Sequence, residues 1–187
     1  MSWPQRLRET AATPWQPVGF KTAVVIVALN LWMLAQGSFG DRWAPVLDHA
    51  NLVFHEAGHV VFGLISERLA VYGGSLMQML MPLAAAATFW SRRQPAGFGL
   101  CLGWACESLL NVATYMADAR AMALPLIGGL DPETYHDWRE IFSRWGMLEL
   151  DEAWAALNRV IAWIVGLAVS AWLLRRAASG RSVEPAP

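Results

Sequence analysis

The chain has little charge, few histidines and almost no cysteine. Charged residues make up 16% of its 187 residues, whereas soluble domains carry about 25%. The 14 basic and 15 acidic residues nearly cancel and form no basic stripe, which excludes nucleic acid as a partner. The two cysteines, Cys101 and Cys106, lie inside an apolar run and make neither a disulfide framework nor a zinc knuckle.

Apolar residues, by contrast, make up 56% of the chain, and 11 residues are Trp. A disordered chain is poor in apolar residues and rich in charge, so disorder is excluded. The apolar share also exceeds the roughly 45–50% of a water-soluble domain. The length allows one domain or two very small ones, and the composition indicates an integral membrane protein.

We expect an all-α, polytopic membrane helix bundle of about five spans with one amphipathic surface helix, because a spanning helix needs roughly 20 apolar residues. A polar N-terminal tail (residues 1–17) precedes the membrane-embedded domain (residues 18–176), and a polar C-terminal tail (residues 177–187) follows it. The apolar runs that predict the spans are residues 18–36, 44–65, 75–90, 96–117 and 156–174. A secretory signal is an alternative interpretation of the first run, since Arg6 and Arg8 precede it.

The segment that begins at Asp131 has the pattern of the surface helix. Asp131 can cap a helix, and Pro132 suits the first helical position. The apolar residues that then recur at intervals of three and four are Tyr135, Trp138, Phe142 and Trp145. This spacing places them in one stripe, and we expect the helix to lie on the membrane surface or to pack across the bundle.

The motif His-Glu-Ala-Gly-His at residues 55–59 indicates chemistry. Positions four apart share a helix face, so His55 and His59 can bind one metal ion through their imidazole nitrogens. Glu56 is turned aside from this pair, yet it is close enough to take a proton from metal-bound water. Zinc lowers the pKa of such a water toward about 7, which makes hydroxide available at neutral pH.

The alternative is that both histidines only form hydrogen bonds, because the five-letter pattern often arises by chance. The context favours a metal site. Two of the four histidines fall in the motif, and it lies in an apolar segment, where a charged side chain costs about 2.5–3.5 kcal/mol. A bound divalent metal ion would compensate for a Glu between two histidines at that depth.

A third ligand has to come from another segment. We select Asp118, because it ends the fourth predicted span and can face the second span from there. The alternative for Asp118 is a solvated acid paired with Arg120. His136 and Asp137 are the next candidates, either as a ligand or as a hydrogen-bond partner of a ligand. The remaining candidates are His49, Glu107 and Asp131.

Three further residues are candidates for substrate binding. Gly74 follows another glycine and allows close backbone approach. Gln78 and Asn111 offer amide groups inside apolar segments, where they could hold the backbone of an extended substrate. The alternative for Gly74 and Gln78 is a turn followed by helix packing through small residues.

These residues together resemble the site-2 protease family of intramembrane zinc metalloproteases. Residues 55–59 match the family's H-E-x-G-H on a membrane helix, including the glycine. Residues 74–78 are similar to its G-x-x-x-N/S/G element, with Gln at the last position. Residues 111–118 resemble its Asn-containing stretch ending in L-D-G, although Asp118 is flanked by alanines, the Asn–Asp spacing is shorter and the internal Pro is missing. The similarity covers about residues 50–120.

The resemblance implies a zinc metalloprotease that cuts a membrane protein or peptide substrate within or near the lipid bilayer. It implies Glu56 as the general base and Asp118 as the third zinc ligand. It also implies an integral protein of the bacterial inner (plasma) membrane, with the active site toward the cytoplasm. The full set of implied site residues is His55, Glu56, His59, Gly74, Gln78, Asn111 and Asp118.

Two other functions remain open at this point. The departure around Asp118 suggests a catalytically inactive membrane protein with a structural or regulatory metal site. Intramembrane His, Glu and Asp residues often line ion paths, which suggests a metal transporter, or else a polar helix-packing module without metal. One compact cluster, rather than a series of polar residues across several spans, favours the protease. No feature of the sequence selects an oligomeric state.

Overall fold

The computed structural model describes residues 2–38, 45–126, 129 and 131–181. The described residues form helices and no strands. The N-terminal half contains α1 (Trp3–Ala12), α2 (Phe20–Ser38), α3 (Pro45–Gly63) and α4 (Glu67–Ser91). The C-terminal half contains α5 (Pro95–Ala117), α6 (Pro132–Tyr135), α7 (Asp137–Trp145), the 3-10 helix η2 (Leu148–Leu150) and α8 (Asp151–Arg181). The predicted all-α class is therefore confirmed.

Four helices in the described part of the chain are long and apolar enough to cross a membrane. They are α2, α4, α5 and the helix within Leu148–Ser179, which is mostly α8. The predicted second span, residues 44–65, corresponds to α3, which is not among these four. Its 19 residues include Asp48, Glu56 and three histidines, and these polar side chains lower its hydropathy. The predicted count of five spans is thus not confirmed.

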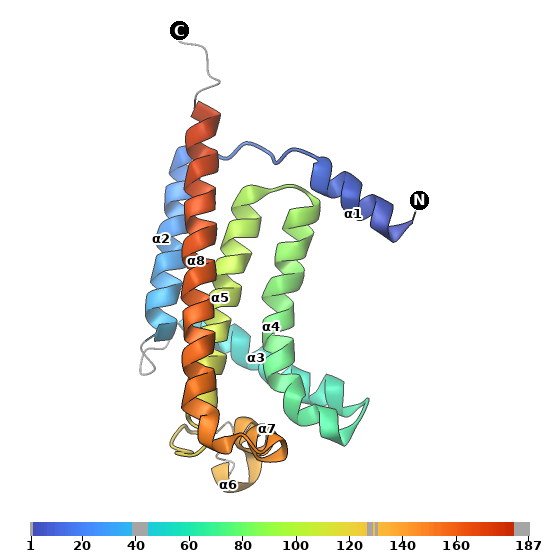
Figure 1. The fold of residues 1–187 in the computed structure, drawn as a ribbon, viewed down its shortest axis with the longest axis vertical. Helices are drawn as coiled ribbons and strands as arrows, with labels where there is room; N and C mark the ends of the chain where they lie inside the picture. Colours follow the sequence, from blue (N-terminus) through green and yellow to red (C-terminus); the bar gives the residue numbers. More distant parts are fainter. Residues whose placement is uncertain (1, 39–44, 127–128, 130, 182–187) are drawn as a thin grey trace.

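The four long helices stand side by side, with α5 packed against α2, α4 and α8 (Figure 1). The start of α2, the turn between α4 and α5 and the end of α8 lie together at the upper end in Figure 1. At the lower end, α3 runs obliquely across the bundle, and α6 and α7 lie beneath it. Since α2 and α5 run downward while α4 and α8 run upward, α3 begins and ends on the lower side.

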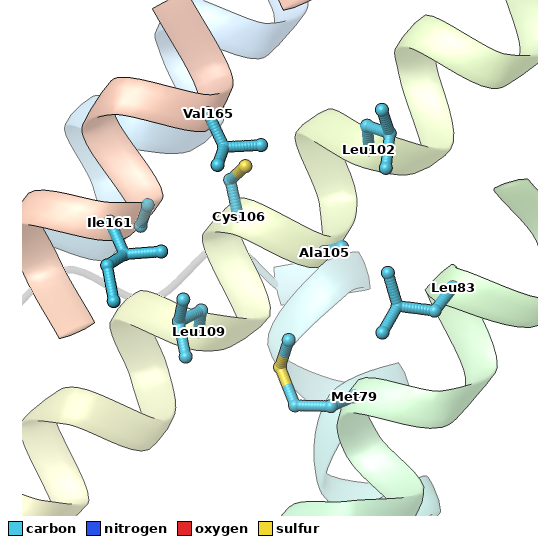
Figure 2. A pocket seen from close by; sticks show the side chains of 9 residues that line it. Met79, Leu83, Leu102, Ala105, Cys106, Leu109, Ile161 and Val165 are labelled. Atoms are coloured by element: carbon cyan, nitrogen blue, oxygen red, sulfur yellow. The ribbon is translucent and has the colours of Figure 1, made fainter.

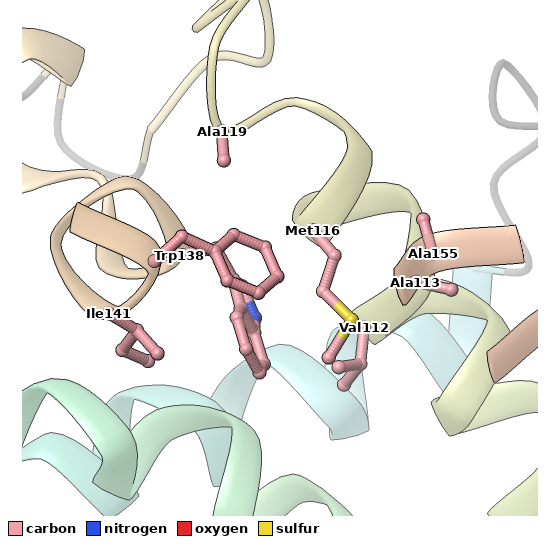
Figure 3. Packing of buried hydrophobic residues seen from close by; sticks show 8 residues of the cluster. Val112, Ala113, Met116, Ala119, Trp138, Ile141 and Ala155 are labelled. Atoms are coloured by element: carbon pink, nitrogen blue, oxygen red, sulfur yellow. The ribbon is translucent and has the colours of Figure 1, made fainter. Parts of the chain in front are cut away.

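The short helix α7 packs on the bundle through its apolar side. Phe142 and Ile141 are almost fully buried, and Trp138 lies towards Val112 and Met116 of α5 (Figure 3). Two members of the predicted stripe, Tyr135 and Trp145, remain exposed. The structure therefore shows that α7 packs against α4 and α5 at the lower end of the bundle, whereas its expected position relative to the membrane surface stays a prediction.

The glycine pair at residues 73 and 74 does not form the turn that we predicted before residue 75. Helix α4 starts earlier, at Glu67, after Ser66 accepts a hydrogen bond from the Arg68 N–H as the N-cap. Gly73 instead faces Gly58 of α3, and a Cβ on either glycine would overlap the backbone of the other. The two glycines let the backbones of α3 and α4 touch at the motif.

The two predicted tails are partly helical. Residues Trp3–Ala12 of the N-terminal tail form α1. Helix α8 continues through residue 176 to Arg181, and residues 182–187 of the predicted C-terminal tail lie outside the described residues.

Candidate metal centre

Three side chains from two helices meet at one point near the lower end of the bundle. His55 and His59 lie one turn apart on α3, and Asp137 is the first residue of α7. The Oδ2 atom of Asp137 is 3.0 Å from His55 Nε2 and 3.2 Å from His59 Nε2. One ligand atom from each residue lies within 4.8 Å of the others, so this group could hold a metal ion.

Hydrogen bonds on the far side of each imidazole ring set its orientation. His59 Nδ1 is 2.8 Å from the carbonyl oxygen of Ala70, which can only accept, so Nδ1 carries the proton. His55 Nδ1 faces Gln78 Oε1 at 3.3 Å, while the amide nitrogen of Gln78 donates to the carbonyl of Ser108. Both rings therefore present Nε2 towards Asp137, as ligand histidines do when their other nitrogen is hydrogen-bonded.

A proton or a metal ion between the three residues would stabilise this arrangement. The Nε2 atoms of two neutral imidazoles and a carboxylate oxygen are all acceptors, and acceptors at 3.0–3.2 Å repel each other. Either protons or a metal ion can relieve the repulsion. For a tetrahedral site with ligand bonds of 2.0–2.1 Å, the ligand atoms are about 3.3 Å apart. The observed separations fit the edges of such a site.

Gly74 of α4 leaves the space in front of the two imidazoles open. A Cβ at this position would lie 2.5 Å from His55 Nε2 and 2.7 Å from His59 Nε2, closer than side-chain atoms pack. The glycine that we predicted to bind substrate is thus a wall of the candidate metal centre. Gln78, the second predicted substrate residue, is buried and orients His55.

The Gly74→Ala variant is expected to lose affinity for a divalent metal ion by up to about 100-fold, because the added methyl group displaces both Nε2 atoms, at a cost of about 1–3 kcal/mol for overpacking. Competition with a chromogenic chelator measures the affinity. Gly63→Ala is the matched control, since its Cβ would meet only Ala70 Cβ at an ordinary 3.5 Å. Equal zinc affinity in both variants would contradict the placement of the ion.

Asp137 is buried, and its position at the start of α7 stabilises a negative charge. Its backbone N–H donates to the hydroxyl of Tyr115 at 3.2 Å. Burial alone would raise its pKa, but when His55 and His59 carry a proton on Nε2 in place of a metal ion, their hydrogen bonds outweigh burial and hold the pKa of Asp137 below its ordinary value. The carboxylate is therefore ionised at neutral pH, as a metal ligand has to be.

The structure places Asp118, our predicted third ligand, outside this group. Its carboxylate accepts the backbone N–H groups of Ala123 and Leu124 at 2.9 and 3.0 Å and faces His136 Nε2 at 3.2 Å. Asp118 thus closes the loop after α5. Its alternative partner, Arg120, pairs instead with Asp151 and Glu149.

His136 connects Asp118 to Asp137, which takes the place of Asp118 as the candidate third ligand. Its Nδ1 accepts the Arg139 N–H at 3.2 Å and caps α7, so its Nε2–H is free to donate to Asp118. Burial of the imidazole, which Asp118 only partly offsets, lowers the pKa of His136, so the ring is neutral at pH 7. The pair fixes the start of α7, where Asp137 lies.

Glu56, the predicted general base, is exposed beside the two histidines. Asn111 lies elsewhere: its amide donates to Asp48 Oδ1 and Glu107 Oε1, both at 2.7 Å. Asn51 also donates to Glu107, at 2.8 Å. Asn111 therefore belongs to a network that joins α3 to α5, rather than to the candidate metal centre.

The remaining weaker candidates are not ligands of the group either. His49 is exposed, and Asp131 caps α6 by accepting the backbone N–H of Glu133 at 3.2 Å. Sequence reasoning kept Asp137 as an alternative to Asp118. The signal that could have favoured it is the pair His136-Asp137 within the segment that follows Asp131, because a cap at His136 places the next residue at a helix start.

An apolar pocket of about 150 Å³ lies between α4, α5 and α8, away from this chemistry (Figure 2). Its walls are apolar side chains such as Leu83, Leu109 and Val165, together with Cys106. No carboxylate or imidazole lines it, so the candidate reaction centre is the His55–His59–Asp137 group. Comparisons of the chain with family models, with curated proteins and with solved structures gave no match.

Proposed function

We propose that this protein is a membrane-embedded zinc metalloprotease that hydrolyses peptide bonds of a membrane protein or peptide near the bilayer. One observation carries the proposal: two histidines of an H-E-x-x-H motif present Nε2 to a buried aspartate, with the Glu of the motif exposed beside them. Three protein ligands leave a fourth position for water, which is the pattern of a catalytic rather than a structural zinc site.

The proposed roles follow from the position of each side chain. A bound zinc ion would supply Lewis acidity, which polarises the scissile carbonyl and lowers the pKa of water. Glu56 accepts the proton of the attacking water and passes it to the leaving amine. Gln78 and the carbonyl of Ala70 hold the imidazoles in place, while Asp118 and His136 hold α7 and therefore Asp137.

The surroundings of the site favour a substrate at the membrane surface. The outer face of α3 exposes apolar side chains: Val53 and Val60 are 65% and 66% exposed, and Val46 is 83% exposed. The opposite face carries the ligands. Such a helix lies in the bilayer interface with its apolar side in lipid, so a peptide segment leaving the bilayer would reach Glu56 and the open ligand position.

The test uses the full-length protein purified in mild detergent and a fluorogenic peptide built from a transmembrane segment with a flexible end. We expect about one zinc ion per chain and cleavage that stops after chelation, because Glu56 alone cannot activate water. Added zinc, but not magnesium, should restore cleavage, since magnesium prefers oxygen ligands.

Two results would contradict the proposal. Cleavage that persists in metal-free protein would exclude the metal-assisted reaction. Stoichiometric zinc without cleavage of any peptide in a panel of transmembrane sequences would favour a structural or regulatory metal site instead.

A further inference from the structure

The two ends of the bundle differ in charge. The described basic residues at the α1 end, which also holds the α4–α5 turn and the end of α8, are Arg6, Arg8, Lys21, Arg92, Arg93, Arg175, Arg176 and Arg181. Glu9 is the single acidic residue among the described residues there. At the metal-centre end the exposed acidic residues include Glu67, Asp131, Glu133, Glu140, Glu149 and Glu152.

The basic residues at the two ends also differ in their partners. Near the metal centre, Arg120 pairs with Asp151 at 2.8 Å, and Arg144 pairs with Glu140 at 2.7 Å. The other described basic residues at the metal-centre end are Arg68, Arg139 and Arg159, the last of which lies about two turns into α8. At the α1 end, the described residues form no ion pair.

Arginines at the α1 end contact carbonyls and aromatic rings instead. Arg93 donates to the carbonyls of Thr13 and Ala11, and its guanidinium lies 4.3 Å from the ring centroid of Trp15. Arg176 lies over Trp172 at 5.4 Å. The positive charge of this end is therefore not neutralised within the described protein, and tryptophans accompany it, as at a membrane interface.

Helix α1 has the form of a surface anchor. It extends sideways from the upper end of the bundle (Figure 1). Trp3 and Leu7, four positions apart, share one face and are 72% and 37% exposed. At 100° per residue, Arg6 and Arg8 lie on either side of that face, where they can reach lipid headgroups while Trp3 and Leu7 enter the bilayer.

We propose that the α1 end lies against the anionic cytoplasmic leaflet and that the metal centre opens on the non-cytoplasmic side of the membrane. Lys and Arg residues beside span ends favour the cytoplasmic side, and anionic lipids of that leaflet attract basic residues that have no acidic partner in the protein. The acidic end faces away from this leaflet. The resemblance implied a cytoplasmic active site, and a count of five spans agreed with it. With α3 on one side of the bundle and the α1 end in the cytoplasm, the metal centre lies on the opposite side.

The orientation narrows the substrate class. If the proposed protease activity holds, its substrates are peptide segments in the outer half of the bilayer or just outside it, on the non-cytoplasmic side. The orientation itself does not depend on that activity, because it follows from charge and helix direction alone.

A pair of variants of the full-length protein, each with one added cysteine, tests the orientation. Ser143→Cys lies on α7 at the metal-centre end, and Ser91→Cys ends α4 at the α1 end; both serines are exposed. Cys101 and Cys106 are buried, and the unsubstituted protein measures their background. In intact cells, a membrane-impermeant maleimide should label Ser143→Cys at least tenfold more than Ser91→Cys, and permeabilisation should equalise the two.

Preferential labelling of Ser91→Cys in intact cells would overturn the proposed orientation. Equal labelling of both variants before permeabilisation would overturn it as well, since that shows a mixed orientation. Labelling in detergent first establishes that both cysteines react in the folded protein. Because no step measures hydrolysis, failure of the orientation and failure of the proposed protease activity are distinguishable.

Discussion

Zinc affinity is expected to fall by at least about 100-fold in the Asp137→Asn variant, which removes a direct ligand, whereas changes behind a ligand typically cost about 10–100-fold. The amide leaves two imidazole nitrogens without their anionic partner at 3.0 and 3.2 Å. Asp118→Asn should lose about tenfold or less, because Asp118 acts only through His136 and the loop after α5.

The two asparagine variants form a matched pair, since both remove one buried carboxylate from the same end of the bundle. Zinc content by mass spectrometry after gel filtration and affinity by chelator competition give the comparison, and circular dichroism checks that both variants fold. A larger loss in Asp118→Asn than in Asp137→Asn would show that the sequence-based choice of ligand was right.

Cleavage by the Glu56→Gln variant is expected to be about 10²–10⁴-fold slower than that of the unsubstituted protein, the usual contribution of general acid–base catalysis. The amide has nearly the shape of the carboxylate but cannot accept the proton of water. Glu56 lies outside the group of His55, His59 and Asp137, so zinc content should stay at about one ion per chain.

The measurement is kcat on the fluorogenic transmembrane peptide, with zinc content determined on the same sample. Glu67→Gln is the control, because Glu67 is also an exposed glutamate of the α3–α4 hairpin but begins α4 away from the motif. A Glu56→Gln protein that cleaves as fast as the control would remove Glu56 from the reaction. Loss of zinc in Glu56→Gln would instead assign it a role in holding the metal.

The spans that are apolar on all sides could be predicted from composition alone. The runs 18–36 and 96–117 correspond closely to α2 (Phe20–Ser38) and α5 (Pro95–Ala117). The run 44–65 predicted which residues form α3, but it did not predict that α3 lies across the lower end of the bundle instead of spanning it. Its apolar residues occupy one face and its polar residues the other, and a hydropathy argument based on length does not separate a spanning helix from an interfacial one.

The local part of the candidate site was also predictable, because His55 and His59 are separated by one helical turn. The third carboxylate was not, since it depends on how a segment 82 residues away from His55 folds back on the bundle. The choice between Asp118 and Asp137 follows from the break between α6 and α7 at His136. Both residues are aspartates, so only their positions in the fold distinguish them.

The distance along the chain between the ligands has a consequence for biosynthesis. Translation proceeds at about 5–20 residues per second, so Asp137 leaves the ribosome roughly 4–16 s after His59. During this interval the nascent chain has both histidines on the α3–α4 hairpin but lacks the third ligand. The complete group of His55, His59 and Asp137 forms only after α7 packs on α5, so a chain still being inserted, or one truncated before α7, holds no complete candidate metal centre.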